Sequence, residues 1–417
     1  MLTSLLDNDF YKITMQNAVI KRFPYAHARY AFINRGEHAF PDGFGAELRY
    51  EVDKMASLRL SDEEKRYLEI TCPYLDPTYL DFLAGFHYNP SEVIVEQQGS
   101  DLSVIIEGPW YRTILWEVPL MALISELWYR LRGVTITPDA DAMIEQRAQE
   151  KIELYRRLGL KIAEFGTRRR FSSDVHDRVV GALSHHGGEA FSGTSNVLMA
   201  MHHGVKPIGT HAHEWFMFHG ARFGFKMANS LALEHWVDVY RGDLGIALTD
   251  TFTSKAFYDS FDKKFAKLFD GVRHDSGDPI EFASQTIDHY ERLGINPLSK
   301  TIIFSDALTP EKVERIHTFC KGRIGMAFGI GTNFTNDVGV EPMNMVIKMV
   351  EARPEGQGWL PVIKLSDVAE KNTGDPEMIS LATLGATLGA TWVATTLGAT
   401  WVVMTWAVML AKRVEAK

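Results

Sequence analysis

Several residue types that mark common protein classes are scarce in this chain. Among 417 residues there are only two cysteines, Cys72 and Cys320, which are too few for a disulfide framework and are not spaced as a thiolate metal site. Basic residues are not in excess, because 44 Lys and Arg stand against 53 Asp and Glu, and the formal net charge of -9 disfavours a nucleic-acid partner. The composition therefore favours a reducing compartment and small-molecule substrates.

Signals for export and for the commonest nucleotide-binding loops are also missing. Asp7 and Asp9 lie where a secretory signal would carry basic residues followed by an apolar run, so a cytoplasmic location is expected. There is no G-x-x-x-x-G-K-[ST] loop, and Gly329-Ile330-Gly331 is not a dinucleotide-binding fingerprint because Phe334 stands where the third glycine belongs. Any phosphate must be held by another kind of loop.

Charged residues are absent from residues 378–411, within which Thr-Leu-Gly-Ala-Thr-Trp-Val occurs at 387–393 and again at 396–402. The length would permit a membrane span, but frequent Thr and Gly weaken insertion, and no membrane partner is expected. Replication slippage, a frameshift or an insecure sequence assignment would leave the same low-complexity pattern. Residues 378–417 are therefore treated as an atypical tail.

The length and a hydrophobic content of 46% predict two domains with substantial cores. Strands expected at residues 28–32, 93–96 and 102–107 favour an N-terminal α+β domain over residues 1–125, followed by a buried helix at 114–131. Residues 340–375, with strands expected at 346–350 and 362–365, are predicted to complete this domain.

From about residue 158 onward, short apolar runs meet polar turns and then helical patterns, which indicates βα units. In the clearest unit, a strand at 300–305 is followed by the helix-start signals Thr309 and Pro310 and by a helix at 311–320. Polar residues gather where each strand ends. The sequence therefore predicts an α/β fold whose residues 126–339 form an irregular, TIM-like β/α barrel, with a doubly wound open sheet as the alternative.

The strand-end glycines Gly329 and Gly331, with Thr332, could expose backbone N–H groups to a phosphate, although a tight turn would use glycine equally well. Three arginines, Arg168, Arg169 and Arg170, follow another strand, and at least one could grip a phosphate or a carboxylate; a solvated charge run is the alternative.

Further charged residues follow other strands of the same region. Arg273, with the carboxylates Asp250, Asp275 and Asp306, predicts a ribose phosphate bound with a divalent cation. Helix capping by Asp278 and structural ion pairs would explain the same residues.

His211 and His213 are two residues apart on an expected strand and would face the same side if the strand is regular, whereas a break at its end would separate them. Such a pair could hold Zn²⁺ in a barrel hydrolase, which is the alternative from a different class of enzyme.

Taken in order, a set of motifs resembles nicotinate phosphoribosyltransferases over residues 1–376. They are Asp9-Phe10-Tyr11-Lys12, Phe165-Gly166-Thr167-Arg168, Gly193-Thr194-Ser195-Asn196, Gly209-Thr210-His211-Ala212-His213-Glu214-Trp215, Arg273-His274-Asp275-Ser276-Gly277-Asp278-Pro279, Phe304-Ser305-Asp306 and Phe328-Gly329-Ile330-Gly331-Thr332. The resemblance implies an ATP-coupled condensation of nicotinate with phosphoribosyl pyrophosphate in NAD salvage, with Mg²⁺ and a homodimer.

The resemblance also implies residue roles. His213 would be phosphorylated by ATP, Phe165 and a neighbouring subunit's Tyr11 would sandwich the pyridine ring, and a neighbour's Arg35 would assist the phosphate. Ser195 favours nicotinate, because the sister nicotinamide phosphoribosyltransferases, the alternative within the group, carry an aspartate there. Two features depart from the family pattern, namely Glu370, where a glycine is usual, and the tail.

Transfer of the phosphoribosyl group would be favoured by negative charge near the sugar. Displacement at the anomeric carbon builds positive charge, which Asp250, Asp275 and Asp306 could stabilise. The pyridine nitrogen already has a free lone pair, so no general base is required.

Overall fold

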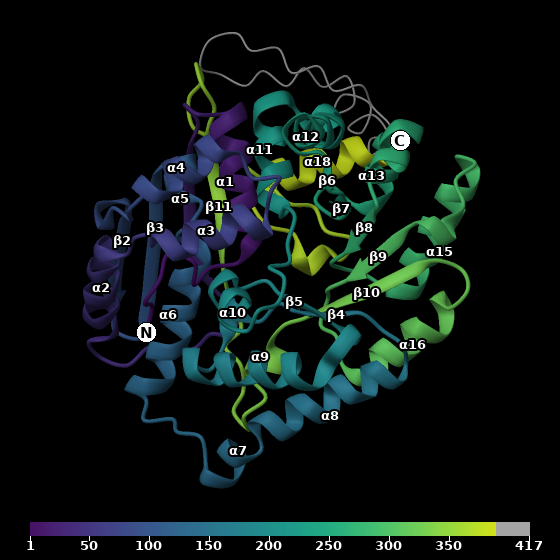
Figure 1. Ribbon diagram of the computed structural model, residues 1–417. Helices are drawn as coiled ribbons and strands as arrows, with labels where there is room; N and C mark the ends of the chain where they lie inside the picture. The colour runs from purple at the N-terminus through teal and green to yellow at the C-terminus, as the bar shows by residue number, and fades with distance from the viewer. Residues whose placement is uncertain (389–417) are drawn as a thin grey trace, which may run out of the picture.

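The chain forms two sheets with helices around them, as a computed structural model that describes residues 1–388 shows (Figure 1). One sheet is antiparallel and built largely from the N-terminal part, and the other is parallel and built from residues 162–330. Within residues 1–388, no helix is both long and apolar enough to cross a membrane. Most of the repetitive tail lies outside the described residues.

The antiparallel sheet has the strand order β12-β11-β1-β3-β2. Its strands are β1 (His27–Asn34), β2 (Val93–Gln98), β3 (Asp101–Pro109), β11 (Met345–Arg353) and β12 (Leu360–Pro361). The helices of this part are α1 (Phe10–Arg22), α2 (Phe44–Lys54), α3 (Asp62–Thr71), α4 (Pro77–Gly85), α5 (Trp110–Thr113) and α6 (Glu117–Leu131). The central strand β1 pairs antiparallel with both β3 and β11, so the chain returns to its N-terminal sheet after the parallel one.

Helix α6 is a buried helix of the N-terminal part of the chain. It is mostly apolar, and nearly all its residues from Glu117 to Leu127 are buried, which is expected of a helix that is hydrophobic on every side. It contacts β11 of the antiparallel sheet and the turn that follows strand β4 (Ile162–Glu164) of the parallel sheet. This helix therefore links the N-terminal part to the site.

The parallel sheet has the strand order β5-β4-β10-β9-β8-β7. Besides β4, its strands are β5 (Phe191–Thr194), β7 (Ile246–Leu248), β8 (Gly271–His274), β9 (Thr301–Phe304) and β10 (Gly325–Ile330), and the short strand β6 (Arg241–Leu244) precedes β7. The helices are α7 (Pro138–Ala142), α8 (Ile144–Arg157), α9 (Ser173–Gly187), α10 (Val197–His202), α11 (His213–Phe223), α12 (Phe225–Tyr240), α13 (Ser254–Ser260), α14 (Lys263–Leu268), α15 (Pro279–Arg292), α16 (Pro310–Cys320), α17 (Thr332–Thr335) and α18 (Pro376–Leu388).

An irregular segment lies between the two edge strands of the parallel sheet. Pro207 forms a parallel bridge with Thr194 at the end of β5. Thr210 donates its hydroxyl to the carbonyl of Ile246 in β7 at 3.1 Å. The segment thus contacts both edges of the sheet, while β5 and β7 do not pair with each other among the described residues.

The sequence predicted most of the elements and misplaced two. The expected strand at 362–365 is wrong, because Lys364 bridges to Thr373 and Leu365 bridges to Phe252 instead. The expected strand through His211 and His213 is also wrong, because α11 begins at His213. Short polar-flanked runs resemble strands by composition, but backbone partners decide whether they pair.

Candidate active site

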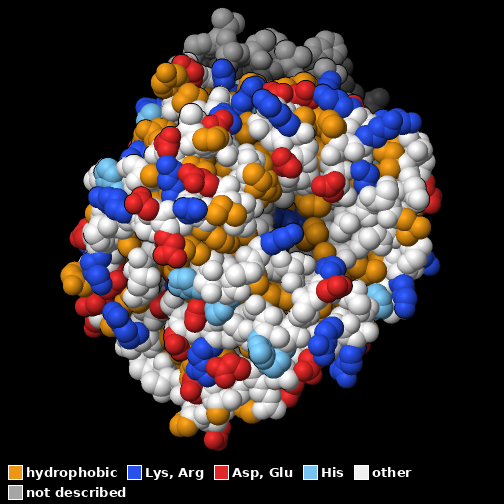
Figure 2. Space-filling view, in the orientation of Figure 1, with side chains coloured by type: hydrophobic (Ala, Val, Ile, Leu, Met, Phe, Trp, Pro, Cys, Tyr) orange, Lys and Arg blue, Asp and Glu red, His pale blue; other side chains and the backbone are white. Residues whose placement is uncertain are grey.

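The polar residues singled out in the sequence come together at the carboxyl ends of the parallel strands. Asp250 follows β7, Asp275 follows β8 and Asp306 follows β9, and Ser195 follows β5. Since neighbouring parallel strands end on the same edge of a sheet, side chains far apart in sequence become neighbours there. Figure 2 shows a recess near the middle of one face of the molecule, with Lys or Arg side chains at its edge.

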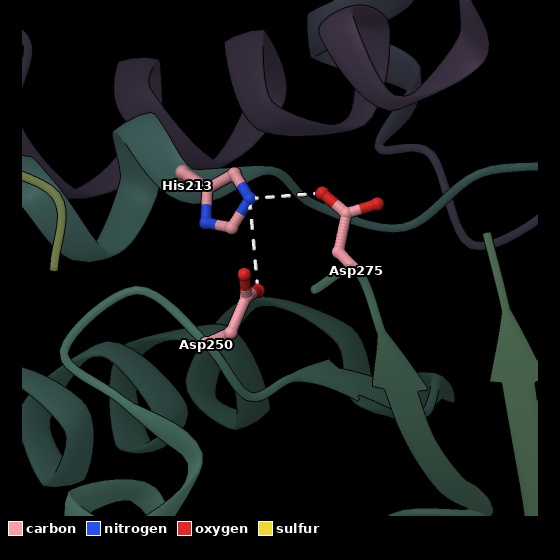
Figure 3. Close-up of side chains that lie close together, drawn as sticks. All are labelled: His213, Asp250 and Asp275. Carbon is pink, nitrogen blue, oxygen red and sulfur yellow. Dashed lines mark hydrogen bonds and ion pairs between the residues drawn. The ribbon is translucent and has the colours of Figure 1, made fainter. Parts of the chain in front are cut away.

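His213 begins α11 and points its imidazole at two of these carboxylates (Figure 3). Its Nε2 lies 3.0 Å from Asp275 Oδ2 and 3.7 Å from Asp250 Oδ1, and its Nδ1 lies 3.1 Å from the hydroxyl of Thr251. Burial, together with the charge of Lys364, lowers the pKa of His213 to about 4. The imidazole is therefore neutral at pH 7, with a lone pair on one nitrogen.

Asp250 is buried and contacts both a lysine, Lys364, and a serine, Ser276. Lys364 Nζ lies 3.1 Å from Asp250 Oδ2, which also accepts a hydrogen bond from Ser276 at 2.6 Å. Burial raises the pKa of Asp250, but the nearby His213 imidazole and the Lys364 ammonium outweigh it, so the pKa is lower than usual. The second oxygen, Oδ1, has no hydrogen-bond partner among the described residues.

Asp275 and Asp306 are the more open carboxylates. Asp275 accepts from the Ser305 hydroxyl at 2.8 Å, and Asp306 pairs with Lys371 at 2.6 Å. Burial raises the pKa of Asp275, but the hydrogen bond with His213 and the charge of Arg273 bring it well below the usual value. These carboxylates are therefore available as negative charges at the strand ends.

Phe165 and the glycine turn meet on the other side of the site. A Cβ placed on Gly329 would lie 2.2 Å from Cε2 of Phe165, so only glycine leaves room for that ring. Neither Gly329 nor Gly331 has a positive φ, so the tight-turn explanation for these glycines does not apply. The missing side chain at Gly329 therefore leaves the space that the partly exposed Phe165 ring occupies.

Arg168, three residues after Phe165, contacts the N-terminal part of the chain. Its guanidinium donates to the Tyr11 hydroxyl at 2.5 Å, lies over the Tyr11 ring, and is 3.5 Å from Asp9. Ser195 donates its hydroxyl to Asp9 at 2.7 Å. The carboxyl group of Asp9 therefore lies beside Ser195. Burial raises the pKa of Asp9 above its usual value.

The three consecutive arginines have different environments. Arg170 is fully buried and holds Asp7 at 2.8 Å and Glu126 at 2.8 Å, so it serves the core and not the rim. Arg169 makes no side-chain ion pair within the described residues, and burial with nearby Arg168 lowers its pKa. Of the three, only Arg168 contacts Tyr11 and Asp9 in the part of the chain that the structure describes, so the solvated-run alternative is wrong for it.

A buried ion-pair group lies directly behind His213. Lys12 is 2.5 Å from Glu117 and 2.5 Å from Glu214, the residue that follows His213. Burial raises the pKa of Glu117, but Lys12 and Arg168 outweigh it and lower the pKa to about 2. This group joins α1, α6 and α11 and fixes the first turn of the helix that carries His213.

Some predicted residues are not part of the cluster. Arg35 lies in the exposed turn after β1 and makes no hydrogen bond or ion pair with the described part of the chain. His211 is buried against Phe216 and Trp236, and its Nε2 accepts the backbone N–H of Leu248 at 3.2 Å. Asp278 caps α15, as the structural explanation held.

The position of His211 is inconsistent with the zinc-hydrolase alternative, because His211 and His213 do not converge. His213, Asp250 and Asp275 do present ligand atoms within 4.8 Å of one another. However, the Lys364 ammonium is 3.0 Å from His213 and 3.1 Å from Asp250, so a cation of the protein already fills this place. The cluster does not fit a resident metal ion.

Lys348 was missed by the sequence analysis. It lies on β11 of the antiparallel sheet, makes no ion pair or hydrogen bond within the described residues, and has Glu117 and Asp275 among its charged neighbours. Burial and the charge of Lys364 lower its pKa to about 8. The pairing of β11 with β1 brings Lys348 near these charges, and no local sequence pattern predicts that pairing.

Comparison with known proteins agrees with the motifs. A family model described as the nicotinate phosphoribosyltransferase (NAPRTase) family matches residues 160–386, and the N-terminal domain model of the same family matches residues 6–125. The chain belongs to this family. The resemblance drawn from the motifs is confirmed, and the chain is an enzyme of the nicotinate phosphoribosyltransferase family.

Individual relatives cover almost the whole chain. A nicotinate phosphoribosyltransferase of Chromohalobacter salexigens is 79% identical over 382 residues, which are 92% of this chain and 97% of that protein. One of Desulforapulum autotrophicum is 50% identical over 91% of this chain and 97% of that protein. The crystal structure of nicotinate phosphoribosyltransferase from Porphyromonas gingivalis has a TM-score of 0.90 at 45% identity, covering 93% of this chain and 100% of that one. The α/β fold with a separate N-terminal part is therefore that of the family.

Proposed function

We propose that the chain transfers the phosphoribosyl group of phosphoribosyl pyrophosphate to nicotinate, giving nicotinate mononucleotide and pyrophosphate with ATP hydrolysis coupled to the transfer. The observation that carries the proposal is that His213 meets Asp250 and Asp275, while Asp306, Phe165 and Arg168 follow other strands at the same edge of the parallel sheet. The role of the reaction is NAD salvage.

The aromatic side of the site is proposed to bind nicotinate. Phe165 would cover one face of the pyridine ring, with Tyr11 on the other, and Arg168 would pair with the nicotinate carboxylate. In this chain Tyr11 already contacts its own Arg168, and a neighbouring subunit's Tyr11 stays a prediction. Ser195 donates a hydrogen bond to Asp9, and the Arg168 guanidinium lies next to it, so both compensate the negative charge of Asp9. A carboxylate ligand is therefore favoured over the amide of the nicotinamide alternative.

The other side of the site is proposed to bind the sugar and its phosphates. Arg273 has a buried Nε with no partner among the described residues, and it is the candidate cation for phosphate, together with Lys348, whose charged neighbours include Asp275. The backbone N–H groups of Gly331 and Thr332, which follow β10, would contribute donors, whereas Gly329 lies within β10. Mg²⁺ would arrive bound to the pyrophosphate as part of the substrate, because Asp250, Asp275 and Asp306 each already have a lysine or histidine partner.

Catalysis would then rest on position and charge. As the bond to pyrophosphate lengthens, Asp250, Asp275 and Asp306 would stabilise the positive charge that builds on the anomeric carbon. The pyridine nitrogen attacks with its own lone pair, so holding the ring against the sugar contributes most of the remaining acceleration. His213, phosphorylated by ATP, would couple ATP hydrolysis to this step.

The larger assembly is also proposed. A homodimer would bring Arg35 of one chain to the partner's site, and a cytoplasmic location suits the substrates. Residues 1–125 with 340–375 would form one domain and 126–339 the other, followed by the tail. The contacts of residues 207–210 with both edges of the parallel sheet support an irregular barrel closed by that segment.

The test is a product assay with the purified protein. Phosphoribosyl pyrophosphate, Mg²⁺ and ATP are supplied with either nicotinate or nicotinamide, and pyrophosphate and the mononucleotide are measured. We expect product with nicotinate and little with nicotinamide. Product with nicotinamide alone, or no pyridine-dependent pyrophosphate release, would reject the proposal.

A second assay tests the proposed coupling. His213→Ala should lose the stimulation by ATP while slow transfer persists. Full ATP stimulation in that variant would reject the role of His213.

A further inference from the structure

The two contacts at Nε2 of His213 require opposite positions of the imidazole proton. Asp275 Oδ2, at 3.0 Å, is a carboxylate oxygen and can only accept, so it favours a proton on Nε2. The Lys364 ammonium, also at 3.0 Å, can only donate, so it favours a lone pair on Nε2. The Thr251 hydroxyl at Nδ1 can donate or accept and is satisfied by either tautomer.

Phosphorylation of Nε2 requires one of these two tautomers. A proton on Nε2 blocks attack on the γ-phosphorus, whereas a lone pair there allows it. We propose that Lys364 selects the reactive tautomer of His213, by donating to Nε2 in competition with Asp275 and so leaving the ring proton on Nδ1. The inference rests on the proposed function, because it concerns the same phosphorylated histidine.

The structure holds Lys364 firmly in that position. Its ammonium is shared with Asp250 Oδ2 at 3.1 Å, and its backbone is paired with Thr373 in both directions, at 2.8 and 3.0 Å. The next residue, Leu365, donates its N–H to the carbonyl of Thr251 at 2.7 Å, which fixes the loop beside the histidine's other hydrogen-bond partner. Lys364 is also buried, so water does not replace it easily.

The surrounding charges favour the same tautomer. Around the imidazole stand two carboxylates, Asp250 and Asp275, and one ammonium, Lys364. Without the ammonium, both carboxylates would favour a proton on Nε2. With it, one carboxylate is already paired and Nε2 meets a positive charge.

The chemical step then balances as follows. The lone pair of Nε2 forms the N–P bond, the bond from the γ-phosphorus to its bridging oxygen breaks, and the electron pair leaves on ADP. The ring proton stays on Nδ1, shared with the Thr251 hydroxyl, and the ring carries positive charge until that proton departs. Lys364, released from Nε2 by the new bond, remains beside the phosphoryl group as a compensating charge.

The experiment measures phosphorylation by ATP alone, with no pyridine or sugar substrate present. Lys364→Met should slow formation of acid-labile phosphate on the protein by about tenfold to a hundredfold, the range expected for one lost hydrogen bond from a charged donor. Lys264→Met, which removes a surface lysine paired with Glu234, is the matched control and should phosphorylate at the wild-type rate. Wild-type phosphorylation in Lys364→Met would overturn the inference.

A second variant separates tautomer selection from simple phosphate binding. Asp275→Asn removes the competing carboxylate and adds an amide donor, so Lys364→Met/Asp275→Asn should regain phosphorylation relative to Lys364→Met. If the double variant is as slow as or slower than the single one, Lys364 acts through the phosphate and the inference is wrong.

The tautomer itself can be read without any reaction. The ¹⁵N resonances of the His213 imidazole, assigned by comparison with His213→Ala, should show a bare Nε2 in the wild type and a protonated Nε2 in Lys364→Met. A protonated Nε2 in the wild type would overturn the inference. This readout stands even if ATP fails to phosphorylate His213, an outcome that would reject the coupling in the proposed function alone.

Discussion

The contact between Gly329 and Phe165 gives a sharp test of the nicotinate pocket. In Gly329→Ala the new methyl carbon would lie 2.2 Å from Cε2 and 2.3 Å from Cδ2 of the ring. Carbon atoms in contact are about 3.5 Å apart or more, so the ring must move by roughly 1.3 Å. The backbone of Gly329 cannot give way instead, since it is paired in the middle of the sheet with Ala163.

A displacement of this size at a substrate-positioning ring is expected to reduce kcat/KM for nicotinate by about tenfold to a hundredfold. The assay is the initial rate of nicotinate mononucleotide formation at varied nicotinate, with phosphoribosyl pyrophosphate saturating. The effect should fall on nicotinate kinetics, while the KM for phosphoribosyl pyrophosphate changes little.

Two controls isolate the ring. Gly85→Ala adds the same methyl group where nothing lies within 4 Å, and its kinetics should match the wild type. Phe165→Ala combined with Gly329→Ala removes the ring atoms that the new methyl group would meet, so the second substitution should add little to the loss caused by the first. A nicotinate KM and kcat in Gly329→Ala within about twofold of wild type would refute the placement of nicotinate against Phe165.

Three further outcomes are expected. Arg170→Met leaves Asp7 and Glu126 buried without their partner and should lower the free energy of unfolding by about 3–5 kcal/mol in urea titrations; a loss below about 1 kcal/mol would contradict this. The pKa of Glu117, lowered to about 2, means that this carboxylate stabilises the fold above its ordinary pKa and that the contribution is lost as pH falls toward 2, so Glu117→Gln should flatten the acid limb of stability against pH. The pKa of Lys348, lowered to about 8, predicts that the KM for phosphoribosyl pyrophosphate rises as pH passes 8, and Lys348→Met should remove that rise; a pH-independent KM in the wild type would argue against phosphate binding there.

The predicted fold succeeded where the pattern was local. The strand ending before Asp306 and the helix after Pro310 lie where expected, because a β-rich run, a proline and an amphipathic repeat are each sufficient signals. The run at 362–365 misled for the same reason. It has the composition of a strand, but only Val362 bonds to β11, at Val350, while Lys364 and Leu365 bond to Thr373 and to residues 251–253, which no local pattern specifies.

The site residues were predicted from strand ends and motifs, and their roles stay predictions. His213, Asp250 and Asp275, expected at three strand ends, lie close together in the structure. The sequence did not indicate that Asp9 would stand beside Ser195, or that Lys348 would face the cluster from the other sheet. Asp9 is 186 residues from Ser195, and Lys348 belongs to a strand of the other sheet, so no local pattern indicates these neighbours.

By itself the sequence determined the chemistry available and the family, because residue types and their order along the strands are properties of the chain alone. The tertiary structure decided the roles of similar residues, such as Arg168 at the rim and Arg170 in the core, or His213 in the cluster and His211 beside Trp236. The physical reason is that burial and pairing depend on which distant segments pack together, and adjacent side chains of one type can point to opposite surroundings.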